Sequence, residues 1–405
     1  MRIRFLPIWM LACFGCALVI VAFNALIDPY LVFGTPRIGG VNLLKPAVET
    51  QERLMKPYDV IRRAPNTVIL GSSIVDLGID AGHAAWPSYA RPVYNGALAG
   101  GGPYSAYRYL QHIMSYHPPA LVVLGVDFEF FIDSPDFIPI TAAFEERLAV
   151  TASGERNAGR LQQYAIDILR ASVSLDAVKD SFSTITANLS GRSSTLSAGN
   201  WESIVPYNLA AALGAHVLVR DTNVANIQRF YRKRMNPRAM ESVRAILKLC
   251  KDHSTQVTIF INPMQAEALE LWDLLGYWRT FENWKRELLS VTNEHAGSDA
   301  RQSIVLWDFS GYDELYSSEG VPTDRSAMRF FWDAIHYRRT LGEVIVARMF
   351  GNDDVPFGVV LTSGNIESHL ANIREQQRLY RLRHGDEARE VKDLYDAVVV
   401  TISGK

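Results

Sequence analysis

Five short apolar runs along the chain predict the strands of a parallel sheet. They are Thr67–Leu70, Pro92–Asn95, Ala120–Val126, Gln256–Ile261 and Ser303–Phe309. Strands that are buried on both faces have continuous apolar sequences of this kind, whereas half-exposed strands alternate apolar and polar residues. Helical patterns separate the runs, and this order of elements is typical of α/β proteins. We therefore predict a doubly wound, five-stranded parallel sheet.

Apolar residues at helical spacing predict the helices that separate and follow these strands. The helical segments are Glu49–Arg63, Tyr104–Tyr116, Arg160–Leu189, Pro237 to about Lys251, Gln265–Val291, Arg338–Phe350, Ile366–Arg383 and Glu387–Val398. Asn236 directly before Pro237 is typical of a helix N-cap followed by proline in the first turn. Between the third and fourth strands no further strand is evident. We predict that this region forms a helical insertion that covers the site as a lid or rim.

The N-terminus contains an apolar run that is long enough to cross a membrane. Residues Phe5 to Ile27 carry no charge, and as a helix they would measure about 35 Å against a hydrocarbon thickness of ~30 Å. Arg2 and Arg4 precede the run and Asp28 follows it, so the positive-inside rule places the N-terminus in the cytoplasm. The alternative is a cleaved signal peptide, but the run is long and lacks a small-x-small site before Asp28. We favour an uncleaved anchor.

These patterns divide the chain into four parts. Residues 1–28 are the cytoplasmic tip and transmembrane anchor, and 29–64 are a juxtamembrane connector. Residues 65–352 form the α/β domain with a helical insertion at about 130–250, and 353–405 form a C-terminal helical extension. The predicted location is the inner membrane of a bacterium, crossed once, with the α/β domain in the periplasm.

Net charge and cysteine count argue against nucleic-acid binding, disulfides and cysteine-rich metal sites. A net charge of −2 with 21% charged residues does not indicate nucleic-acid binding. Of the three cysteines, Cys13 and Cys16 lie inside the predicted anchor and Cys250 stands alone in the exported part. The exported part can therefore form neither an intrachain disulfide nor a cysteine-rich metal site.

Four polar motifs lie at or beyond the ends of predicted strands. Gly71-Ser72-Ser73 follows the first strand, Asn95 begins a stretch to Gly100 after the second, Asp127 closes the third, and Asp333 to His336 lies beyond the fifth. In a doubly wound sheet these ends meet at one edge, where such folds keep their sites. Considered singly, Ser73 as a turn serine and His336 as a surface or helix-cap histidine are the simpler interpretations. The ordered set of four favours a catalytic site.

The motifs supply the groups that acyl transfer requires. Ser73 offers a hydroxyl nucleophile, His336 a base, and Asp333, three residues earlier, a carboxylate that can orient the imidazole. The backbone amides of Gly100 and Ser73 would bind the oxyanion, and the glycine run 100–102 lets the backbone approach an anion at a helix N-terminus. This chemistry needs no metal and no cofactor.

With these residues the chain resembles the SGNH (GDSL-type) hydrolase superfamily, over roughly residues 65–130 and 300–350. It is similar in particular to the membrane-anchored branch that includes alginate and cellulose O-acetylation proteins and the teichoic acid D-alanylation protein. The resemblance implies that Ser73 is the nucleophile, that Gly100 is an oxyanion donor, and that Asp333 with His336 forms the closing DxxH motif. Ser72 stands where the family usually has Asp.

One residue departs from the family pattern. Asp127 occupies the position at which the family has an Asn that donates to the oxyanion. An ionised carboxylate repels an oxyanion, so Asp127 must be protonated, turned away or replaced by another donor. Loss of one such donor costs about 3 kcal/mol of transition-state stabilisation. The departure leaves open whether the site is active.

The resemblance implies a periplasmic serine acyl-esterase or O-acetyltransferase that acts on an exported polysaccharide or a related acyl ester. It also suggests a membrane-bound O-acyltransferase as partner. The alternative is a catalytically degenerate binding or scaffold protein of a cell-envelope polysaccharide system, and Asp127 is its best support. A lysophospholipase or thioesterase would share the triad and differ in the length of the acyl group.

Further polar and aromatic residues are candidates for a substrate rim. Asn95 and Asn262 follow strands, and Arg232 and Arg234 belong to a basic segment that could attract an anionic glycan or lipid head groups. Such a segment is more often a solvated face. Five aromatic residues could stack on sugar rings, although aromatics at this spacing more often belong to a core: Trp201, Tyr207, Trp272, Trp278 and Trp284.

Overall fold

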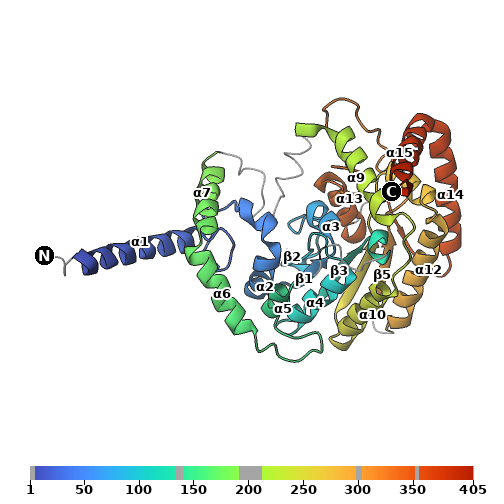
Figure 1. The fold of residues 1–405 in the computed structure, drawn as a ribbon. Helices are drawn as coiled ribbons and strands as arrows, with labels where there is room; N and C mark the ends of the chain where they lie inside the picture. The colour runs from blue at the N-terminus through green and yellow to red at the C-terminus, as the bar shows by residue number, and fades with distance from the viewer. Residues whose placement is uncertain are drawn as a thin grey trace. The chain divides into compact units, whose positions relative to one another are not determined.

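The computed structural model describes residues 5–132, 138, 140–190, 212–297, 303–351 and 355–404 (Figure 1). The chain forms two compact units. The first unit consists of residues 1–64, 111–117 and 140–203. The second consists of residues 65–110, 118–139 and 204–405 and contains the sheet.

A six-stranded sheet lies at the centre of the second unit, with the strand order β2-β1-β3-β4-β5-β6. The strands are β1 (Thr67–Leu70), β2 (Val93–Asn95), β3 (Leu121–Val126), β4 (Gln256–Ile261), β5 (Ile304–Asp308) and β6 (Val359–Val360). Neighbouring strands from β2 to β5 are parallel, and β6 pairs with β5 in the antiparallel direction. The order of the first five strands is one of the two common orders of doubly wound sheets.

The five predicted strands are confirmed, but the prediction of a five-stranded, purely parallel sheet is wrong. Every residue of β1 and β3 is buried, as their continuous apolar sequences indicate. The sixth strand, β6, has two residues, and Val359 is exposed. A strand of this length shows no hydrophobic period, so its sequence cannot be distinguished from a loop.

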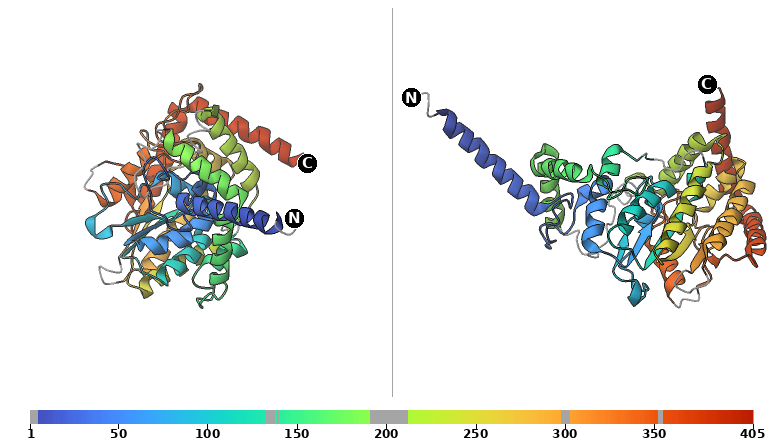
Figure 2. Two further views of the ribbon diagram at one scale, coloured as in Figure 1. Left: turned by 90° about the vertical axis from the view of Figure 1, so that its left-hand side faces the viewer. Right: turned by 90° about the horizontal axis from the view of Figure 1, so that it is seen from below.

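Helices of the second unit flank the strands. They are α3 (Ser73–Gly78), η3 (Ser88–Ala90), α4 (Pro103–Met114, whose end lies in the first unit), η4 (Phe128–Phe131), α9 (Ala215–Phe230), α10 (Pro237–Asp252), α11 (Ala266–Leu274), α12 (Trp278–His295), α13 (Arg339–Phe350), α14 (Ile366–Arg383) and α15 (Gly385–Ser403). The predicted N-cap is confirmed, because the Asn236 side chain accepts a hydrogen bond from the Arg238 N–H at 3.0 Å. The last helix, α15, packs against α9 and α11 (Figure 2).

The first unit is helical in the part that the structure describes. Its elements are α1 (Phe5–Ile27), η2 (Pro46–Thr50), α2 (Glu52–Arg63), α5 (Ala142–Arg147), α6 (Arg160–Val173) and α7 (Leu175–Leu189). The segment predicted to be helical from Arg160 to Leu189 is therefore two helices, which separate at Ser174. Among the described residues, α1 is the one helix that is long and apolar enough to cross a membrane.

A cluster of buried aromatic side chains packs around Phe128, shortly after the end of β3. Phe128 packs against Trp272 and Trp284 with ring centroids 5.5 and 5.4 Å apart. Both tryptophans are 1% exposed. These side chains fix the short helix η4 that follows β3, and they belong to the core rather than to a sugar-binding surface.

A buried charge cluster holds the end of β5. Lys285 from α12 and His369 from α14 contact the Asp308 carboxylate at 2.7 and 2.9 Å. Burial alone would raise the pKa of Asp308, but the Lys285 ammonium and the hydrogen bond with His369 hold it well below its usual range. Ser310 also donates to this carboxylate, at 2.7 Å. The cluster ties α12 and α14 to the sheet.

Candidate active site

Ser73 lies at the point where β1 passes into a helix. The strand ends at Leu70, and after Gly71 the Ser72 hydroxyl accepts a hydrogen bond from the Ile74 N–H at 3.2 Å, which caps α3. Ser73 is the first residue of α3 and is half-buried. The sequence folds in this way because serine is among the preferred N-cap residues. Ser73 therefore stands at the carboxyl edge of the parallel strands.

Three side chains predicted from the sequence to form a triad come together here. The Ser73 Oγ lies 2.8 Å from His336 Nε2, and His336 Nδ1 lies 2.8 Å from Asp333 Oδ2. Asp333 Oδ1 also accepts the backbone N–H groups of Ile335 and His336, each at 2.8 Å. The imidazole is 23% exposed and the carboxylate 18%. The hydroxyl, the base and the orienting acid are thus aligned and accessible from solvent.

The electrostatics of the triad favour an ion pair between imidazole and carboxylate. Burial alone would raise the pKa of Asp333, but His336 and the two backbone N–H groups hold it below its usual value. Burial lowers the pKa of His336, yet Asp333 outweighs burial and the net shift is upward. The carboxyls of Glu129 and Asp127 add to this increase. A base with a raised pKa is a stronger acceptor for the serine proton.

Two backbone N–H groups near the carboxyl end of β1 have no acceptor among the described residues. In the part of the chain that the structure describes, neither the Ser73 N–H nor the Gly100 N–H donates a hydrogen bond. The Gly100 loop lies next to the end of β1, because the Leu98 N–H donates to the Gly71 carbonyl at 2.9 Å. Gly100 has a φ of +63°, a conformation that favours glycine. Free donors at this edge can bind an oxyanion.

Asp127 does not act as a donor in this arrangement. Its Oδ2 accepts the Ser72 hydroxyl at 2.7 Å and its Oδ1 accepts the Asn262 amide at 2.7 Å. Burial raises the pKa of Asp127 to about 6, and the two hydrogen bonds oppose this increase. Above pH 6 the group is therefore a carboxylate that accepts from two neighbours, and it is not the oxyanion donor that the family pattern places at this position.

A chain of hydrogen bonds runs beside the triad. Tyr337 donates to Asn262 Oδ1 at 2.9 Å, Asn262 donates to Asp127, and Ser72 donates to the same carboxylate. Ser72 precedes Ser73, and Tyr337 follows His336. The chain therefore holds the backbone on both sides of the reacting pair. Asn262 is 2% exposed, and the prediction that it lines a substrate rim is wrong, because both ends of its amide are bound inside the protein.

Asn95 also has a structural position. Its amide nitrogen donates to the carbonyls of Val75, Asp76 and Ile79 at 3.3, 3.4 and 3.0 Å, and the residue is 7% exposed. These carbonyls lie at the C-terminal end of α3, where helix acceptors lack intrahelical partners, although that of Val75 also accepts the Ile79 N–H at 3.0 Å. The prediction of a rim role for Asn95 is thus corrected, since its side chain caps the helix that carries Ser73.

Helix α3 is also held from the side by an unusually close contact. A Cβ added at Gly342 in α13 would lie 1.8 Å from the carbonyl oxygen of Gly78. A Cβ at Gly78 would lie 1.9 Å from the ring of Tyr337. Only glycine permits this approach of the two helices, and the contact sets the position of α3 relative to the loop that carries His336.

Glu129, which belongs to none of the four polar motifs, also borders the site. It is 5% exposed, and burial raises its pKa to about 8, with the Asp127 carboxyl adding to the increase. Within the described ranges no group forms a hydrogen bond with its carboxyl. At neutral pH it is therefore mostly protonated, and its charge adds to the pKa of His336 chiefly at alkaline pH. Its position three residues beyond the end of β3 is the one signal in the sequence for this role. The flanking Phe128 and Phe130 make the segment look like part of the core.

The predicted basic rim residues lie on the turn between α9 and α10. Arg232 and Arg234 are both exposed, and Arg232 lies over the Tyr231 ring at 5.0 Å. Their role in binding a substrate stays a prediction. Of the aromatic residues, Trp201 and Tyr207 lie outside the described residues.

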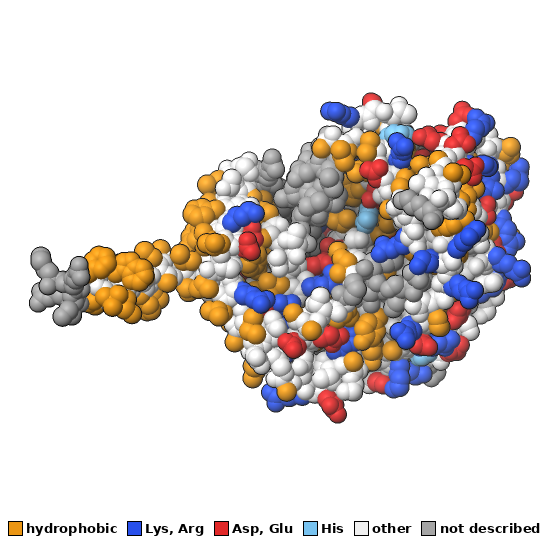
Figure 3. All heavy atoms as spheres, viewed as in Figure 1, with side chains coloured by type: hydrophobic (Ala, Val, Ile, Leu, Met, Phe, Trp, Pro, Cys, Tyr) orange, Lys and Arg blue, Asp and Glu red, His pale blue; other side chains and the backbone are white. Residues whose placement is uncertain are grey.

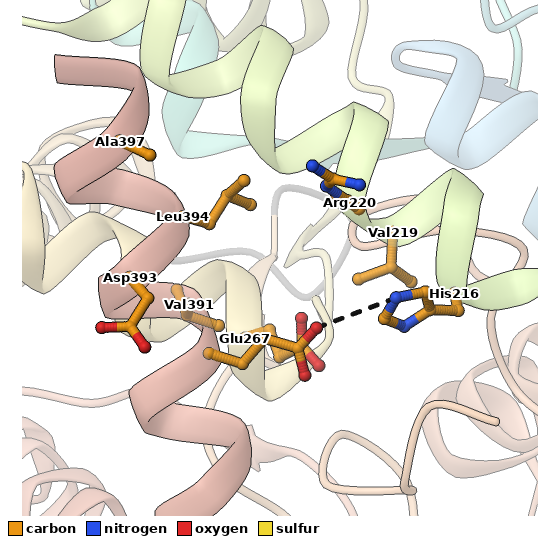
Figure 4. Close-up of a pocket in the computed structure, with 9 residues that line it drawn as sticks. His216, Val219, Arg220, Glu267, Val391, Asp393, Leu394 and Ala397 are labelled. Carbon is orange, nitrogen blue, oxygen red and sulfur yellow. Dashed lines mark ion pairs between the residues drawn. The ribbon is translucent and has the colours of Figure 1, made fainter. Parts of the chain in front are cut away.

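A separate cavity of about 300 Å³ lies between α9, α11 and α15 (Figure 4). Val219, Val391 and Leu394 form part of its wall, and His216 faces Glu390 at 3.8 Å. Burial and the neighbouring carboxylates raise the pKa of Glu267 to about 7. The cavity shares no residue with the triad. Across the described residues, no group of three or more His, Cys, Asp or Glu side chains is placed to hold a metal ion.

Comparisons with known proteins give no independent identification. No family model matches this chain. A search of curated proteins likewise finds no match. A function for this chain is therefore inferred from the geometry of Ser73, His336 and Asp333 and from the sequence motifs that contain them.

Replacing Asp127 by Asn is expected to shift the pH dependence of ester hydrolysis. Above pH 6 the Asp127 carboxylate helps to raise the pKa of His336, and the rate increases as His336 loses its proton. Removal of that charge should move the rising limb to lower pH. The measurement is the pH profile of kcat/KM with p-nitrophenyl acetate. Asp324→Asn, which removes an exposed carboxyl in the loop before α13, should leave the limb in place, and an unchanged profile in Asp127→Asn would contradict the assignment.

Proposed function

We propose that this protein is a membrane-anchored serine esterase or O-acetyltransferase of the SGNH type. The most specific activity that we propose is the transfer or removal of acetyl groups on an exported polysaccharide. The observation that carries the proposal is the alignment of Ser73, His336 and Asp333, with 2.8 Å between Ser73 Oγ and His336 Nε2 and 2.8 Å between His336 Nδ1 and Asp333 Oδ2. The strand order β2-β1-β3-β4-β5 supports it, because doubly wound sheets bind ligands at the edge where these residues lie.

The first half of the reaction forms an acyl-enzyme. The Ser73 oxygen attacks the ester carbonyl carbon while His336 Nε2 takes the hydroxyl proton, and Asp333 holds the imidazole through Nδ1–H. The carbonyl oxygen becomes an oxyanion that accepts hydrogen bonds from the N–H groups of Ser73 and Gly100. The carbon–oxygen bond of the ester then breaks, and the leaving alcohol takes the proton from Nε2.

The second half decides between a hydrolase and a transferase. His336 takes a proton from water or from a sugar hydroxyl, and the resulting oxygen nucleophile attacks the acyl carbon on Ser73. The bond to the Ser73 oxygen breaks, and that oxygen recovers the proton from Nε2. With water the product is a free acid, and with a sugar hydroxyl it is an acylated polysaccharide. A membrane-bound O-acyltransferase that supplies the acyl group is part of this proposal.

The anchor supports a location at the membrane. Helix α1 carries no charged residue, and its residues from Phe5 to Ile20 are exposed. We place the second unit in the periplasm of a bacterium, where acyl groups of exported polysaccharides are accessible. The second candidate is a scaffold protein that keeps the fold without the chemistry, and Asp127 favours it, because a carboxylate replaces the usual donor.

A fluorophosphonate probe separates the two candidates. The full-length protein in detergent is expected to be labelled on Ser73, because the probe forms a covalent bond only with an activated serine. Ser73→Ala should abolish both the label and the hydrolysis of p-nitrophenyl acetate. Ser153→Ala changes an exposed serine and should leave both unaffected. Absence of label in the wild-type protein would favour the scaffold.

A further inference from the structure

Within the first unit, α1 ends against the α6–α7 pair. The Asn24 side chain donates to the Ser172 carbonyl at 2.9 Å, and Ser181 donates to Asn24 Oδ1 at 2.9 Å. The ring of Phe23 lies 5.0 Å from that of Phe182. Asn24 is fully buried, whereas α1 is exposed from Phe5 to Ile20. Helix α1 is therefore exposed in its first part and packs against its own unit from about Phe23 onward.

The connector closes the same end of α1. Thr35 Oγ1 donates to the Ala25 carbonyl at 2.6 Å, and Asn42 donates to the Leu26 carbonyl at 3.2 Å. Lys45 Nζ donates to the Ile27 carbonyl at 2.7 Å. The last carbonyls of the helix thus all have partners, although a helix end normally leaves them free. The direction of α1 relative to α6, α7 and the connector is fixed by these bonds.

Exposed apolar side chains gather where α1 enters this unit, and we call them the apolar collar. The collar consists of Ile38 and Val41 in the connector, Val173 at the end of α6, and Leu175, Phe182 and Leu189 on α7, with exposed fractions of 56, 40, 48, 87, 59 and 73%. Figure 3 shows hydrophobic side chains along α1 that continue onto the surface where α7 lies. Isolated exposed apolar residues are common in soluble proteins, but a contiguous group indicates a binding surface.

The three collar residues on α7 form a single stripe. Leu175, Phe182 and Leu189 recur every seventh residue, so they lie on one face of the helix. The opposite face contains Ala177 and Asn188, which are buried. Ala177 packs with the connector, and the Asn188 amide donates to the Leu44 carbonyl at 2.8 Å. Helix α7 therefore has one face packed against its own unit and one exposed face with this apolar stripe, which lies beside Lys179 and Thr186 and contacts Phe23 of α1 through Phe182.

The length of α1 places the collar at the surface of a bilayer. The part of α1 before Asn24 measures roughly 28 Å at 1.5 Å per residue, which matches a hydrocarbon thickness of ~30 Å. The collar begins where this part ends, since Phe182 contacts Phe23. In Figures 1 and 2, α6 and α7 lie across the end of α1 rather than along it. An apolar helix face in such a position suits the boundary between headgroups and acyl chains.

We infer that the apolar collar is embedded in the lipid leaflet that α1 leaves, so that the first unit lies on the bilayer through the connector and α7 as well as through its anchor. The inference rests on the proposed anchoring role of α1. Lipid is favoured as the occupant because the collar is continuous with the apolar surface of α1. A partner protein or a second copy of the chain is an outcome that the test distinguishes.

The test places spin labels in the full-length protein, with one chain in each nanodisc of phosphatidylethanolamine and phosphatidylglycerol. The background carries Cys13→Ala and Cys16→Ala, and Cys250 is buried and does not react. Labels are attached at Leu175→Cys and Phe182→Cys, with Ser183→Cys as the polar neighbour on α7 and Leu11→Cys in the anchor. The measurement is the collision rate of each label with oxygen, which enriches in lipid, and with a water-soluble nickel complex.

Labels at Leu175→Cys and Phe182→Cys are expected to collide mainly with oxygen, at a depth just below the phosphates, whereas Ser183→Cys should collide mainly with nickel. If the two α7 labels lie in water while Leu11→Cys lies in hydrocarbon, the collar inference is overturned and the anchor stands. If Leu11→Cys also lies in water, the anchor itself fails. Protection of the α7 labels from both reagents would show that protein covers the stripe, and it would equally overturn the inference.

Discussion

Replacing Asp333 by Asn is expected to lower kcat for p-nitrophenyl acetate by about 10⁴-fold, which is the cost of the equivalent change in a serine protease triad. In the present site the Asp333 carboxylate accepts the Nδ1–H of His336 at 2.8 Å, and this leaves Nε2 free to accept the Ser73 proton. An amide at position 333 can donate to Nδ1, which favours the tautomer with hydrogen on Nε2. That tautomer cannot act as the base, so the rate falls although the geometry persists.

The matched control is Asp324→Asn. Asp324 accepts the Ser326 N–H at 2.9 Å in an exposed turn of the loop between β5 and α13, and its loss should leave kcat unchanged. The measurement compares initial rates and the rate of fluorophosphonate labelling in both variants. A wild-type rate in Asp333→Asn would show that the hydrogen-bonded triad does not operate in catalysis.

Replacing Gly342 by Ala is expected to lower the free energy of unfolding by about 3 kcal/mol, near the upper end of ordinary overpacking costs. The added methyl group would lie 1.8 Å from the Gly78 carbonyl oxygen and 2.7 Å from its carbon. Backbone atoms cannot rotate away as a flexible side chain can, so α3 and α13 must move apart. Because α3 carries Ser73 and the loop before α13 carries His336, the same displacement should also reduce fluorophosphonate labelling.

Urea unfolding followed by circular dichroism measures the first effect, and the rate of labelling measures the second. Gly320→Ala is the control, because a Cβ at Gly320 would meet no atom within 4 Å. It should change neither quantity. If Gly342→Ala unfolds at the wild-type urea concentration, the two helices are not held in the close contact described above.

The main strands and the triad are accessible to sequence reasoning for a common physical reason. A parallel sheet buries both faces, so its strands are continuous apolar runs, and the polar residue that follows each run is easily recognised. Ser73 and Asp127 are such residues. The short spacing between Asp333 and His336 lets one turn of backbone carry both side chains, and this relation is local in the sequence.

The interactions that hold the triad are not local, and sequence reasoning did not find them. Asp127 and Asn262 follow strands that are neighbours in the sheet but far apart in the chain, and their hydrogen bond depends on register. A polar residue after a strand can point to solvent or inward, and the sequence of Asn262 or Asn95 does not distinguish the two. The antiparallel strand β6 was missed because two residues carry no hydrophobic period.

The helix that carries Ser73 is held at three places. Ser72 is bound at its first turn, Asn95 holds its last carbonyls, and Gly342 abuts its final residue. None of these fastenings involves the groups that would touch an acyl chain or an acceptor. Substitutions in the surrounding loops should therefore leave Ser73 in its present position relative to His336.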